Sequence, residues 1–286
     1  MKILLTGRDG QVGWELERNL MTVGEIVAFD RKGLNLADPD SIVCRIREVR
    51  PDVIVNAAAY TGVDAAETDE VSASAVNSLA PGIIAEEARS IGALVIHYST
   101  DYVFDGSKPT PYAEVDAVGP LNAYGRTKLA GEAAIVTSGC RHLILRTGWL
   151  YAARGHNFFL TILRRAAEGR TLRIVADQYG SPTPAAAIAR TTAELLQAKR
   201  VLDGSSLYHL TSAGSTSWHG FASAIIGFAE SSVLIDAIKT EDYPTPAHRP
   251  RQSTLNCGRL LADHDVSLPD WRVGLGEVFR ELAKRT

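Results

Sequence analysis

The stretch MKILLTGRDGQVG, residues 1–13, decides the fold of this chain. An apolar run at residues 3–5 leads directly into Gly7, Gly10 and Gly13, and residues 14–20 then repeat apolar side chains at helical spacing. This order predicts a strand, a glycine turn and a helix. Glycines in such a turn let backbone N–H groups approach a pyrophosphate, which then lies at the positive end of the helix. The spacing G-x-x-G-x-x-G is a weak signal alone, because a glycine-rich turn without a ligand has the same pattern.

A second apolar run ends in an acid. Residues 26–29 are typical of a strand, and Asp30 follows about twenty positions after Gly7, where dinucleotide-binding folds place a carboxylate on the adenosine ribose 2′-OH. A turn residue that ends the strand is the plain alternative. Arg31 and Lys32 come next and would offer cationic partners to a 2′-phosphate. The pattern therefore predicts a nicotinamide dinucleotide and leaves NADH and NADPH open.

Alternating strands and helices continue along the chain. Apolar runs at residues 53–56, 93–101 and 142–147 predict strands, and helical spacing recurs at 41–50 and 77–88. We expect Asp38 or Asp40 to cap the first of these helices, and Pro81 to bend or reset the start of the second. Asp64 and Glu67 have the spacing of a capping pair, and residues 105–120 predict a loop. The fold class is therefore α/β, with a doubly wound parallel sheet of the Rossmann-like type.

The chain length favours one large domain or two that share a boundary. We expect a dinucleotide-binding domain over residues 1–150 and a smaller C-terminal α/β domain over 151–286, mainly for the substrate. Within the second part, the spacing predicts helices and short strands at 157–167, 172–175, 185–198, 207–210 and 218–229. The segment at about 185–212 is expected to pack back on the dinucleotide-binding domain.

Composition and charge narrow the partners. The chain has 286 residues, 45% hydrophobic and 22% charged, with a formal charge of −3, which argues against nucleic acid and an anionic membrane as partners. No stretch is long and apolar enough to predict a membrane span, and the first apolar run is too short for a signal peptide. The three cysteines suggest no disulfide framework and no zinc site. We therefore expect a cytoplasmic protein without a metal centre.

A tyrosine and a lysine one helical turn apart are the strongest candidates for catalysis. Tyr124 and Lys128 would project side by side from a helix, and Thr100, at the polar end of the strand at 93–101, would add a hydroxyl. A neighbouring cation favours the phenolate, so we expect Lys128 to lower the pKa of Tyr124 and make it a proton donor to a carbonyl. The plain alternative is that Tyr124 packs while Lys128 is solvated or pairs with Glu132.

Other candidates lie where strands end, since open α/β sheets bind ligands beyond the carboxyl ends of their strands. The small residues at 57–59 suit either a cofactor or tight packing. Trp149 faces a substrate or the core, and Arg249 with Arg251 either holds a diphosphate or lies exposed on a proline-stiffened loop. The motifs of serine hydrolases, P-loop proteins, zinc proteases and EF-hands are absent.

Taken together, these motifs resemble the extended short-chain dehydrogenase/reductases and, more narrowly, the dTDP-4-dehydrorhamnose reductase family. The resemblance runs the full length of the chain. It is carried by the glycine turn, Asp30, and the segments NAAA (56–59), VDAAE (63–67), STDYVF (99–104), YGRTK (124–128), RTGW (146–149), DQYGSPT (177–183) and YPTP (243–246). The resemblance implies reduction of the C4 ketone of dTDP-4-dehydro-L-rhamnose to dTDP-L-rhamnose with NADPH or NADH, a step of nucleotide-sugar biosynthesis.

The resemblance also implies roles for individual residues. Thr100, Tyr124 and Lys128 would be the catalytic group. Substrate contacts would come from Thr100, Asp101, Trp149 and Arg249. The cofactor would be bound by Gly7, Gly10, Gln11, Val12, Asp30, Arg31, Asn35, Leu36, Ala59, Tyr60, Thr61, Tyr98, Tyr124 and Lys128.

The chain departs from the family pattern at several positions. Many members carry an acid in place of Asn35 and a serine in place of Gly148. Some members dimerise through Mg²⁺ held by glutamates; Glu15 matches one of these, but a second falls on Ala186, which counts against a metal bridge. A monomer and a homodimer both remain open. Two rival functions also remain, namely a nucleotide-sugar dehydratase or epimerase of the same superfamily and a non-catalytic reductase-like regulatory subunit.

Overall fold

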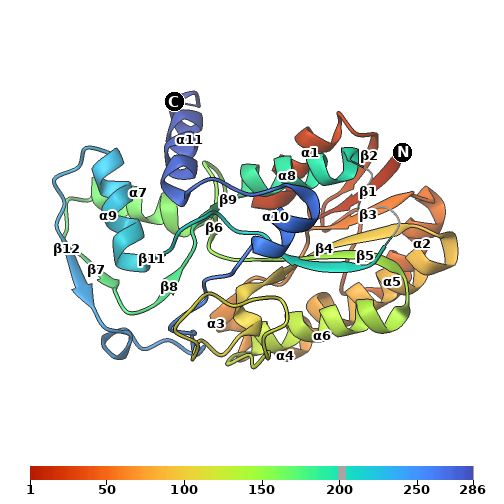
Figure 1. Ribbon diagram of the computed structural model, residues 1–286, viewed down its shortest axis with the longest axis horizontal. Coiled ribbons are helices and arrows are strands. Elements are labelled where there is room, and N and C mark those ends of the chain that lie inside the picture. Colours follow the sequence, from red (N-terminus) through yellow and green to blue (C-terminus); the bar gives the residue numbers. More distant parts are fainter. Residues whose placement is uncertain (199–203, 286) are drawn as a thin grey trace.

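A six-stranded parallel sheet forms the centre of the structure (Figure 1). The computed structural model describes residues 1–198 and 204–285. The strands lie in the order β2-β1-β3-β4-β5-β10, and every pairing is parallel. Their bounds are β1 (Lys2–Thr6), β2 (Glu25–Phe29), β3 (Val53–Asn56), β4 (Leu94–Thr100), β5 (Arg141–Thr147) and β10 (Ser206–His209).

Helices cover both faces of this sheet, because successive side chains of a strand point to opposite faces. Ile3 and Leu5 pack in one apolar cluster with residues of α1 (Gln11–Leu20) and α8 (Ala185–Gln197). Leu4, between them, packs in another with residues of α2 (Pro39–Val49), α5 (Ala80–Ile91) and α6 (Ala123–Ser138). Figure 1 shows the two helix layers above and below the strands. The predicted doubly wound parallel sheet is confirmed.

Local sequence signals set several helix ends. Asp38, not Asp40, caps α2, where its side chain accepts hydrogen bonds from the N–H groups of Asp40 and Ser41. Asn122 caps α6 in the same way through Gly125 N. Gly92 and Gly139 end α5 and α6 in the left-handed conformation that glycine adopts without strain.

The C-terminal elements build a third apolar cluster beside the sheet. It joins α7 (Phe158–Ala167), α9 (Trp218–Phe228) and α11 (Trp271–Ala283) around buried side chains such as Phe159, Phe221 and Trp271. Next to them β7 (Leu172–Val175) pairs in parallel with β12 (Ile235–Ile238). The remaining short elements are β6 (Leu150–Tyr151), β8 (Tyr179–Gly180), β9 (Thr183–Pro184), β11 (Thr216–Ser217) and α10 (Gly258–His264).

The structure corrects the expected course of residues 63–91. Asp64 and Glu67 do not form a capping pair, since α3 (Val63–Ala66) begins at Gly62 without a side-chain cap. Glu67 instead accepts a hydrogen bond from Ala123 N at 2.7 Å. The helix expected at 77–88 begins as a π-helical turn, Ala75–Leu79, between α4 (Glu70–Ser74) and α5. Such turns interrupt α-helices mainly at functional sites.

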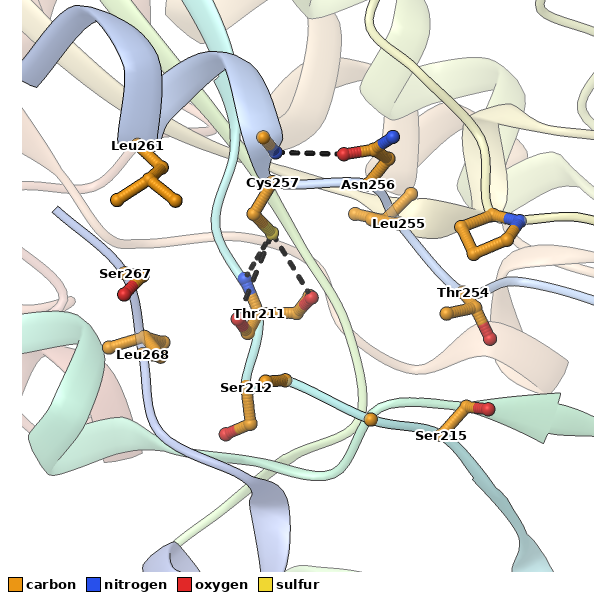
Figure 2. A pocket seen from close by; sticks show the side chains of 14 residues that line it. Thr211, Ser212, Ser215, Thr254, Leu255, Asn256, Cys257, Leu261, Ser267 and Leu268 are labelled. Carbon is orange, nitrogen blue, oxygen red and sulfur yellow. Dashed lines mark hydrogen bonds between the residues drawn. The ribbon is translucent and has the colours of Figure 1, made fainter. Parts of the chain in front are cut away.

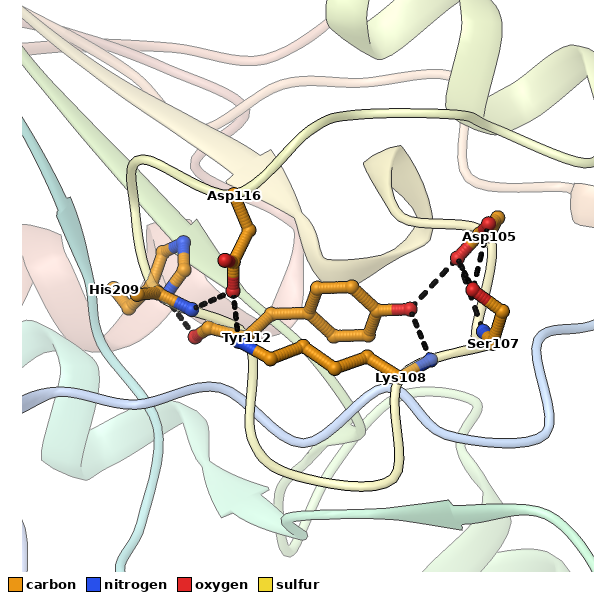
Figure 3. A network of polar contacts seen from close by, with 7 residues as sticks. Asp105, Ser107, Lys108, Tyr112, Asp116 and His209 are labelled. Atoms are coloured by element: carbon orange, nitrogen blue, oxygen red, sulfur yellow. Dashed lines mark hydrogen bonds and ion pairs between the residues drawn. The ribbon is translucent and has the colours of Figure 1, made fainter.

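The loop at residues 105–120 is ordered by polar contacts rather than by regular structure (Figure 3). Tyr112 donates its hydroxyl to Asp105 at 2.7 Å, and Lys108 pairs with Asp116. His209, at the end of β10, donates from Nδ1 to the carbonyl oxygen of Tyr112 at 3.0 Å. These bonds fasten the loop to the edge of the sheet and deliver the chain into α6.

Within residues 1–198 and 204–285, no helix combines the length and the apolar character needed to cross a membrane.

Candidate active site

A cleft of about 730 Å³ opens at the carboxyl ends of β1, β2 and β3. The strand order reverses beside β1, and such reversals are where open α/β sheets bind ligands. The cleft collects residues that are far apart in the sequence. Among the predicted cofactor residues, its lining contains Gly7, Gly10, Gln11, Val12, Asp30, Arg31, Asn35, Leu36, Ala59, Tyr60 and Thr61.

The glycine turn fits a pyrophosphate. Gly7 has a φ of +72°, and a Cβ there would lie 2.8 Å from Ala58 N. A Cβ on Gly13 would lie 2.0 Å from the carbonyl oxygen of Gly7, so a larger residue would push the helix away from the turn. The N-terminus of α1 begins at Gly10 with no side-chain cap. Its backbone N–H groups and the helix dipole are therefore available to an anion.

The second strand ends at the adenosine end of the cleft. Asp30 Oδ1 accepts hydrogen bonds from Lys32 N at 3.0 Å and Gly33 N at 2.7 Å, so this carboxylate also shapes the turn that follows β2. The structure thus shows Asp30 as a turn residue, and its contact with the ribose stays a prediction. Arg31 lines the cleft beside it. The site therefore offers an acceptor to a ribose hydroxyl and a cation to a 2′-phosphate.

Lys128 is buried at the bottom of the site and points at β4. Its Nζ lies 2.6 Å from the carbonyl oxygen of Tyr98 and 3.2 Å from His97 Nε2, and the side chain is only 2% exposed. Burial lowers the pKa of Lys128 to about 8, while the carboxylate of Glu132 acts in the opposite direction. Glu132 itself is held by Arg146 in a buried two-point ion pair with distances of 2.9 and 2.7 Å.

The expectation that Lys128 lowers the pKa of Tyr124 is wrong for this structure. Burial raises the pKa of Tyr124 to about 12, and the nearby Asp101 also raises it. A hydrogen bond between the side chains of Tyr124 and Thr100 acts in the opposite direction without reversing the shift. Tyr124 and Thr100 thus meet as expected. The phenol is protonated at neutral pH, which suits an acid.

Asp101 is a buried carboxylate against a glycine. Its Oδ1 accepts a hydrogen bond from Thr100 Oγ1 at 3.1 Å, and its Oδ2 has no partner in the described part of the chain. Burial raises the pKa of Asp101 to about 6. A Cβ on Gly148 would lie 2.4 to 2.6 Å from the carboxyl group, so glycine at 148 makes room for Asp101. This explains in part why a serine at 148 would alter the site.

Trp149 is buried and stacked rather than open to the cleft. Its ring lies parallel to that of Trp218, with centroids 3.5 Å apart, and its Nε1 donates to Ser253 Oγ at 3.2 Å. The backbone of Trp149 has a φ of +51°, which is rare for a bulky residue and occurs mostly at functional positions. In this structure Trp149 therefore belongs to the interface between the sheet edge and α9.

Arg249 is neither exposed nor free. Its Nη2 lies 2.7 Å from Asp64 Oδ2, and its Nη1 donates to the carbonyl oxygen of Ala247 at 3.2 Å. Asp64 also accepts from Ala247 N at 3.2 Å. The hydrogen bond from Arg249 holds the pKa of Asp64 below its usual value. This pair ties the loop around residue 249 to α3.

Tyr98 is placed differently from the other predicted cofactor residues. Its ring lies in the core cluster with α8, and its hydroxyl is 2.7 Å from Thr192 Oγ1. Only its backbone carbonyl oxygen faces Lys128. A cofactor contact from the side chain of Tyr98 remains a prediction.

A second pocket, of about 360 Å³, lies between the loop after β10 and the start of α10 (Figure 2). Its walls include Thr211, Ser212, Ser215 and the thiol of Cys257, which lies 3.4 Å from Thr211 N. No charged side chain lines it. It therefore lacks the cations that a nucleotide diphosphate requires.

The described residues offer no support for a bridging metal. Within ranges 1–198 and 204–285, no group of three or more His, Cys, Asp or Glu side chains is placed to hold a metal ion. Glu15 is buried, and burial raises its pKa. Position 186 carries an alanine. A metal-bridged dimer stays a prediction, and the alanine at 186 counts against it.

Several residues of the site were missed by the sequence analysis. Asn77, in the π-helical turn, accepts from Tyr60 N at 2.8 Å and donates to Tyr60 O at 3.0 Å, which fixes that cleft residue. Asn56 and His97 contact each other beneath Lys128. The sequence did carry a signal for Asn56 and His97, because each is a polar residue inside or at the end of an apolar strand. Burying such a side chain costs free energy unless it is hydrogen-bonded.

Comparison with known proteins agrees with this geometry. Residues 1–284 match the family described as the RmlD substrate binding domain. A dTDP-4-dehydrorhamnose reductase of Burkholderia thailandensis is 47% identical over 99% of this chain and 99% of its own length. The Escherichia coli protein of that name is 42% identical over 100% of this chain and 99% of its own. A dTDP-4-dehydrorhamnose reductase of Bacillus anthracis, solved in complex with NADP, superposes with a TM-score of 0.93 at 33% identity, covering 98% of this chain and 99% of its own.

The doubly wound sheet, the glycine turn and the cleft at its carboxyl edge define a nicotinamide-dinucleotide-dependent oxidoreductase. Within that class, the match over nearly the whole chain settles the family. This chain belongs to the dTDP-4-dehydrorhamnose reductase family.

Proposed function

We propose that this protein reduces the C4 ketone of dTDP-4-dehydro-L-rhamnose to dTDP-L-rhamnose with NADPH or NADH. The observation that carries the proposal is the dinucleotide cleft at the carboxyl edge of the sheet, together with the contact between Tyr124 and Thr100, one helical turn from Lys128. The names of the relatives support the choice of substrate. The nicotinamide dinucleotide supplies the hydride when it is bound.

The residues of the cleft would hold the cofactor in two ways. Gly7, Gly10, Gln11 and Val12 would bind the pyrophosphate through the uncapped start of α1. Asp30 and Arg31 would contact the adenosine ribose or its 2′-phosphate. The remaining predicted contacts, to the adenine and the nicotinamide ribose, are Asn35, Leu36, Ala59, Tyr60, Thr61, Tyr98 and Lys128.

Tyr124 would act as the general acid. Hydride addition to a ketone produces an alkoxide, which is a much stronger base than a phenolate, so proton transfer from the phenol is favourable. The raised pKa keeps Tyr124 protonated at neutral pH, and its hydrogen bond with Thr100 orients it towards the ketone. Lys128 would then replace the proton that Tyr124 gives away. General acid catalysis of this kind contributes roughly 10²–10⁴-fold to the rate.

Substrate contacts are proposed for Asp101, Trp149 and Arg249 together with Thr100. Asp101 has a carboxylate oxygen without a partner, which can accept a sugar hydroxyl. Arg249 would release Asp64 and bind the diphosphate by charge-assisted hydrogen bonds. Trp149 would contact the sugar with its ring.

A division into two domains accompanies this assignment. We propose that residues 1–150 bind the dinucleotide and that 151–286 mainly bind the substrate. The pairing of β10 with β5 and the packing of α8 on α1 support a return of residues 185–212 to the first domain. We propose that the protein is a monomer or homodimer in the cytoplasm. The reducing compartment fits the three cysteines, which are all free.

The Tyr124→Phe variant tests the reaction. It should bind NADPH normally and lose at least about 100-fold in kcat with dTDP-4-dehydro-L-rhamnose, because it keeps the ring and removes the acid. The control is Tyr208→Phe on β10. It removes a hydroxyl that donates to Asp263 at 2.8 Å. An unchanged kcat in the folded Tyr124→Phe variant would overturn the proposal.

Turnover without added NADPH, with tightly bound NAD⁺, would favour a dehydratase or epimerase. Absence of NADPH oxidation with the wild-type protein would favour a regulatory subunit.

A further inference from the structure

Three polar side chains form a row beneath Lys128. Thr6, Asn56 and His97 lie on the adjacent strands β1, β3 and β4, and the sheet register pairs Thr6 with Asn56 and Asn56 with His97. Each is 1% exposed. We call this row the Thr6–Asn56–His97 ladder. Burying three polar groups in a sheet is costly unless all are hydrogen-bonded, and here every neighbour in the ladder is bonded to the next.

The ladder has a direction, which follows from the orientation of the Asn56 amide: its oxygen faces Thr6 and its nitrogen faces His97. Ala58 N donates to Thr6 Oγ1 at 3.2 Å. Thr6 Oγ1 then donates its own proton to Asn56 Oδ1 at 2.7 Å. The amide nitrogen of Asn56, which also only donates, lies 3.1 Å from His97 Nδ1. His97 Nδ1 must therefore accept, so the proton of the neutral ring is on Nε2.

The contact between His97 and Lys128 determines how the ladder acts on the lysine. His97 is neutral, because burial and the neighbouring Lys128 hold its pKa well below the usual value. Its Nε2–H points at Lys128 Nζ, 3.2 Å away. An N–H can donate to the lone pair of a neutral amine but not to an ammonium group. The amine still donates to the carbonyl oxygen of Tyr98.

We propose that Thr6, Asn56 and His97 are positioning residues, which hold Lys128 Nζ in place and stabilise its side chain after it has given up a proton. The inference rests on the proposed function, in which Lys128 reprotonates Tyr124. In that step an N–H bond of the ammonium breaks and the O–H bond of the phenol forms, directly or through an intervening hydroxyl. The ladder stabilises the amine that results.

The other charged groups near Lys128 do not supply this effect. On α6, Glu132 favours the ammonium, but its carboxylate is already paired with Arg146 from β5. Tyr124, one turn earlier on α6, is protonated at neutral pH. From β3 the ladder contributes only the neutral amide of Asn56. The direction of the ladder therefore opposes the ammonium in addition to burial, which lowers the pKa of Lys128.

The tautomer of His97 tests the ladder without any activity. NMR of ¹⁵N-histidine-labelled, ligand-free protein should show His97 with its proton on Nε2 and a bare Nδ1, and a labelled His97→Gln sample identifies its signals. A proton on Nδ1 would overturn the proposal, since Nε2 would then accept from an ammonium. This measurement stands even if the protein does not reduce the keto-sugar, so it separates failure of the ladder from failure of the proposed function.

The pH profile of kcat/KM tests the effect on Lys128, because this ratio reports the ionisations of the free enzyme. With NADPH and dTDP-4-dehydro-L-rhamnose, wild-type kcat/KM should fall as the pH rises through about 8, where Lys128 loses its proton. The Asn56→Asp variant reverses the ladder, because a carboxylate only accepts and His97 must then donate from Nδ1. The basic limb should move up by about one pH unit or more, with little change in KM.

A milder variant and a control complete the experiment. Thr6→Val keeps the shape of the side chain and frees the Asn56 amide to turn over, so its basic limb should move in the same direction by less. It decides the question if Asn56→Asp does not fold. Thr191→Val removes an equally buried hydroxyl on α8, over the opposite face of the sheet, and should leave the limb in place. A folded Thr6→Val or Asn56→Asp protein with the wild-type limb would contradict the ladder.

Discussion

At the scale of single residues, burial decides the chemistry of the site. Tyr124, Lys128 and Asp101 each have a pKa displaced towards the neutral form, and desolvation is the largest cause in every case. The sequence placed Tyr124 and Lys128 on one helix and Thr100 nearby. It did not predict that Lys128 turns towards β4, because the helix spacing specifies a face and not a partner.

Asp101 gives a prediction at this scale. Its ordinary pKa of 3.8 is raised to about 6, so the folded protein binds this proton more tightly than the unfolded chain does. The contribution of Asp101 to the free energy of unfolding therefore falls as the pH rises from about 4 to about 6, by about 3 kcal/mol. In Asp101→Asn this loss is absent. The stability of the variant relative to wild type should rise by about that amount between pH 4 and pH 7 in urea titrations.

Asp105→Asn is the control of opposite sign. Backbone and side-chain hydrogen bonds hold the pKa of Asp105 below its ordinary value, so its contribution to stability is present above that value and lost in acid. The stability of this variant relative to wild type should fall as the pH rises. An Asp101→Asn curve parallel to wild type between pH 4 and pH 7 would show that the carboxylate is not desolvated.

At the scale of elements, α6 is the part on which the site depends. It carries Tyr124 and Lys128, and its N-cap Asn122 is fully buried. Asn122 Oδ1 accepts from Gly125 N at 2.8 Å, while its Nδ2 donates to His248 O at 2.8 Å. One side chain therefore both starts the helix and holds the segment that leads to Arg249.

The two functions of Asn122 can be separated. Asn122→Ala should lower the free energy of unfolding by about 2–3 kcal/mol, because it loses the cap and leaves buried groups unpaired. Asn122→Ser keeps a cap acceptor but cannot reach His248, so it should lose about half as much in urea unfolding. Ser217→Ala removes the cap of α9 alone, a 3.0 Å bond to Gly220 N, and should cost about 1 kcal/mol. Equal losses for Asn122→Ala and Asn122→Ser would contradict a separate role for the bond to His248.

At the scale of the whole molecule, the loop around Arg249 connects the C-terminal elements to the helices under the sheet. The ion pair between Arg249 and Asp64 spans 185 positions of sequence. In Figure 1 the chain after β12 runs from the small strands at one end of the molecule to α10 beside the central sheet. The pair therefore restrains the loop. It also engages the guanidinium of Arg249, which we propose binds the diphosphate.

The Asp64→Asn variant tests this competition. If Arg249 must leave Asp64 to bind the substrate, neutralising Asp64 should lower KM for the nucleotide-sugar about 2- to 5-fold, with kcat little changed, because a partly exposed pair is worth up to about 1 kcal/mol. Protease cleavage near residues 243–250 should become faster. Glu70→Gln, which breaks the exposed pair with Arg126 at 3.2 Å, should change neither quantity. A raised KM in Asp64→Asn would indicate that the pair positions Arg249 for binding instead.

The sequence alone determined the elements that have a local cause. Strand, glycine turn and helix follow from short-range periodicity and from the conformational freedom of glycine, so the fold class and the glycine turn of the cleft could be predicted. Cleft residues such as Tyr60 and Thr61 came only from the family resemblance. The later elements β12, α10 and α11 were not predicted, and the π-helical turn was not either. For α11 the physical reason is that packing of Trp271, Leu275 and Val278 against distant segments stabilises the helix more than local propensity does.

Only the tertiary structure decided which distant polar groups meet. The Thr6–Asn56–His97 ladder depends on the register of three strands, and the stacking of Trp149 on Trp218 and the pairing of Asp64 with Arg249 join segments far apart in the chain. Desolvation, which sets the pKa values of Tyr124, Lys128 and Asp101, exists only once the chain has closed around them. The sequence thus supplied the chemical groups and their local geometry, while packing determined their partners and their protonation.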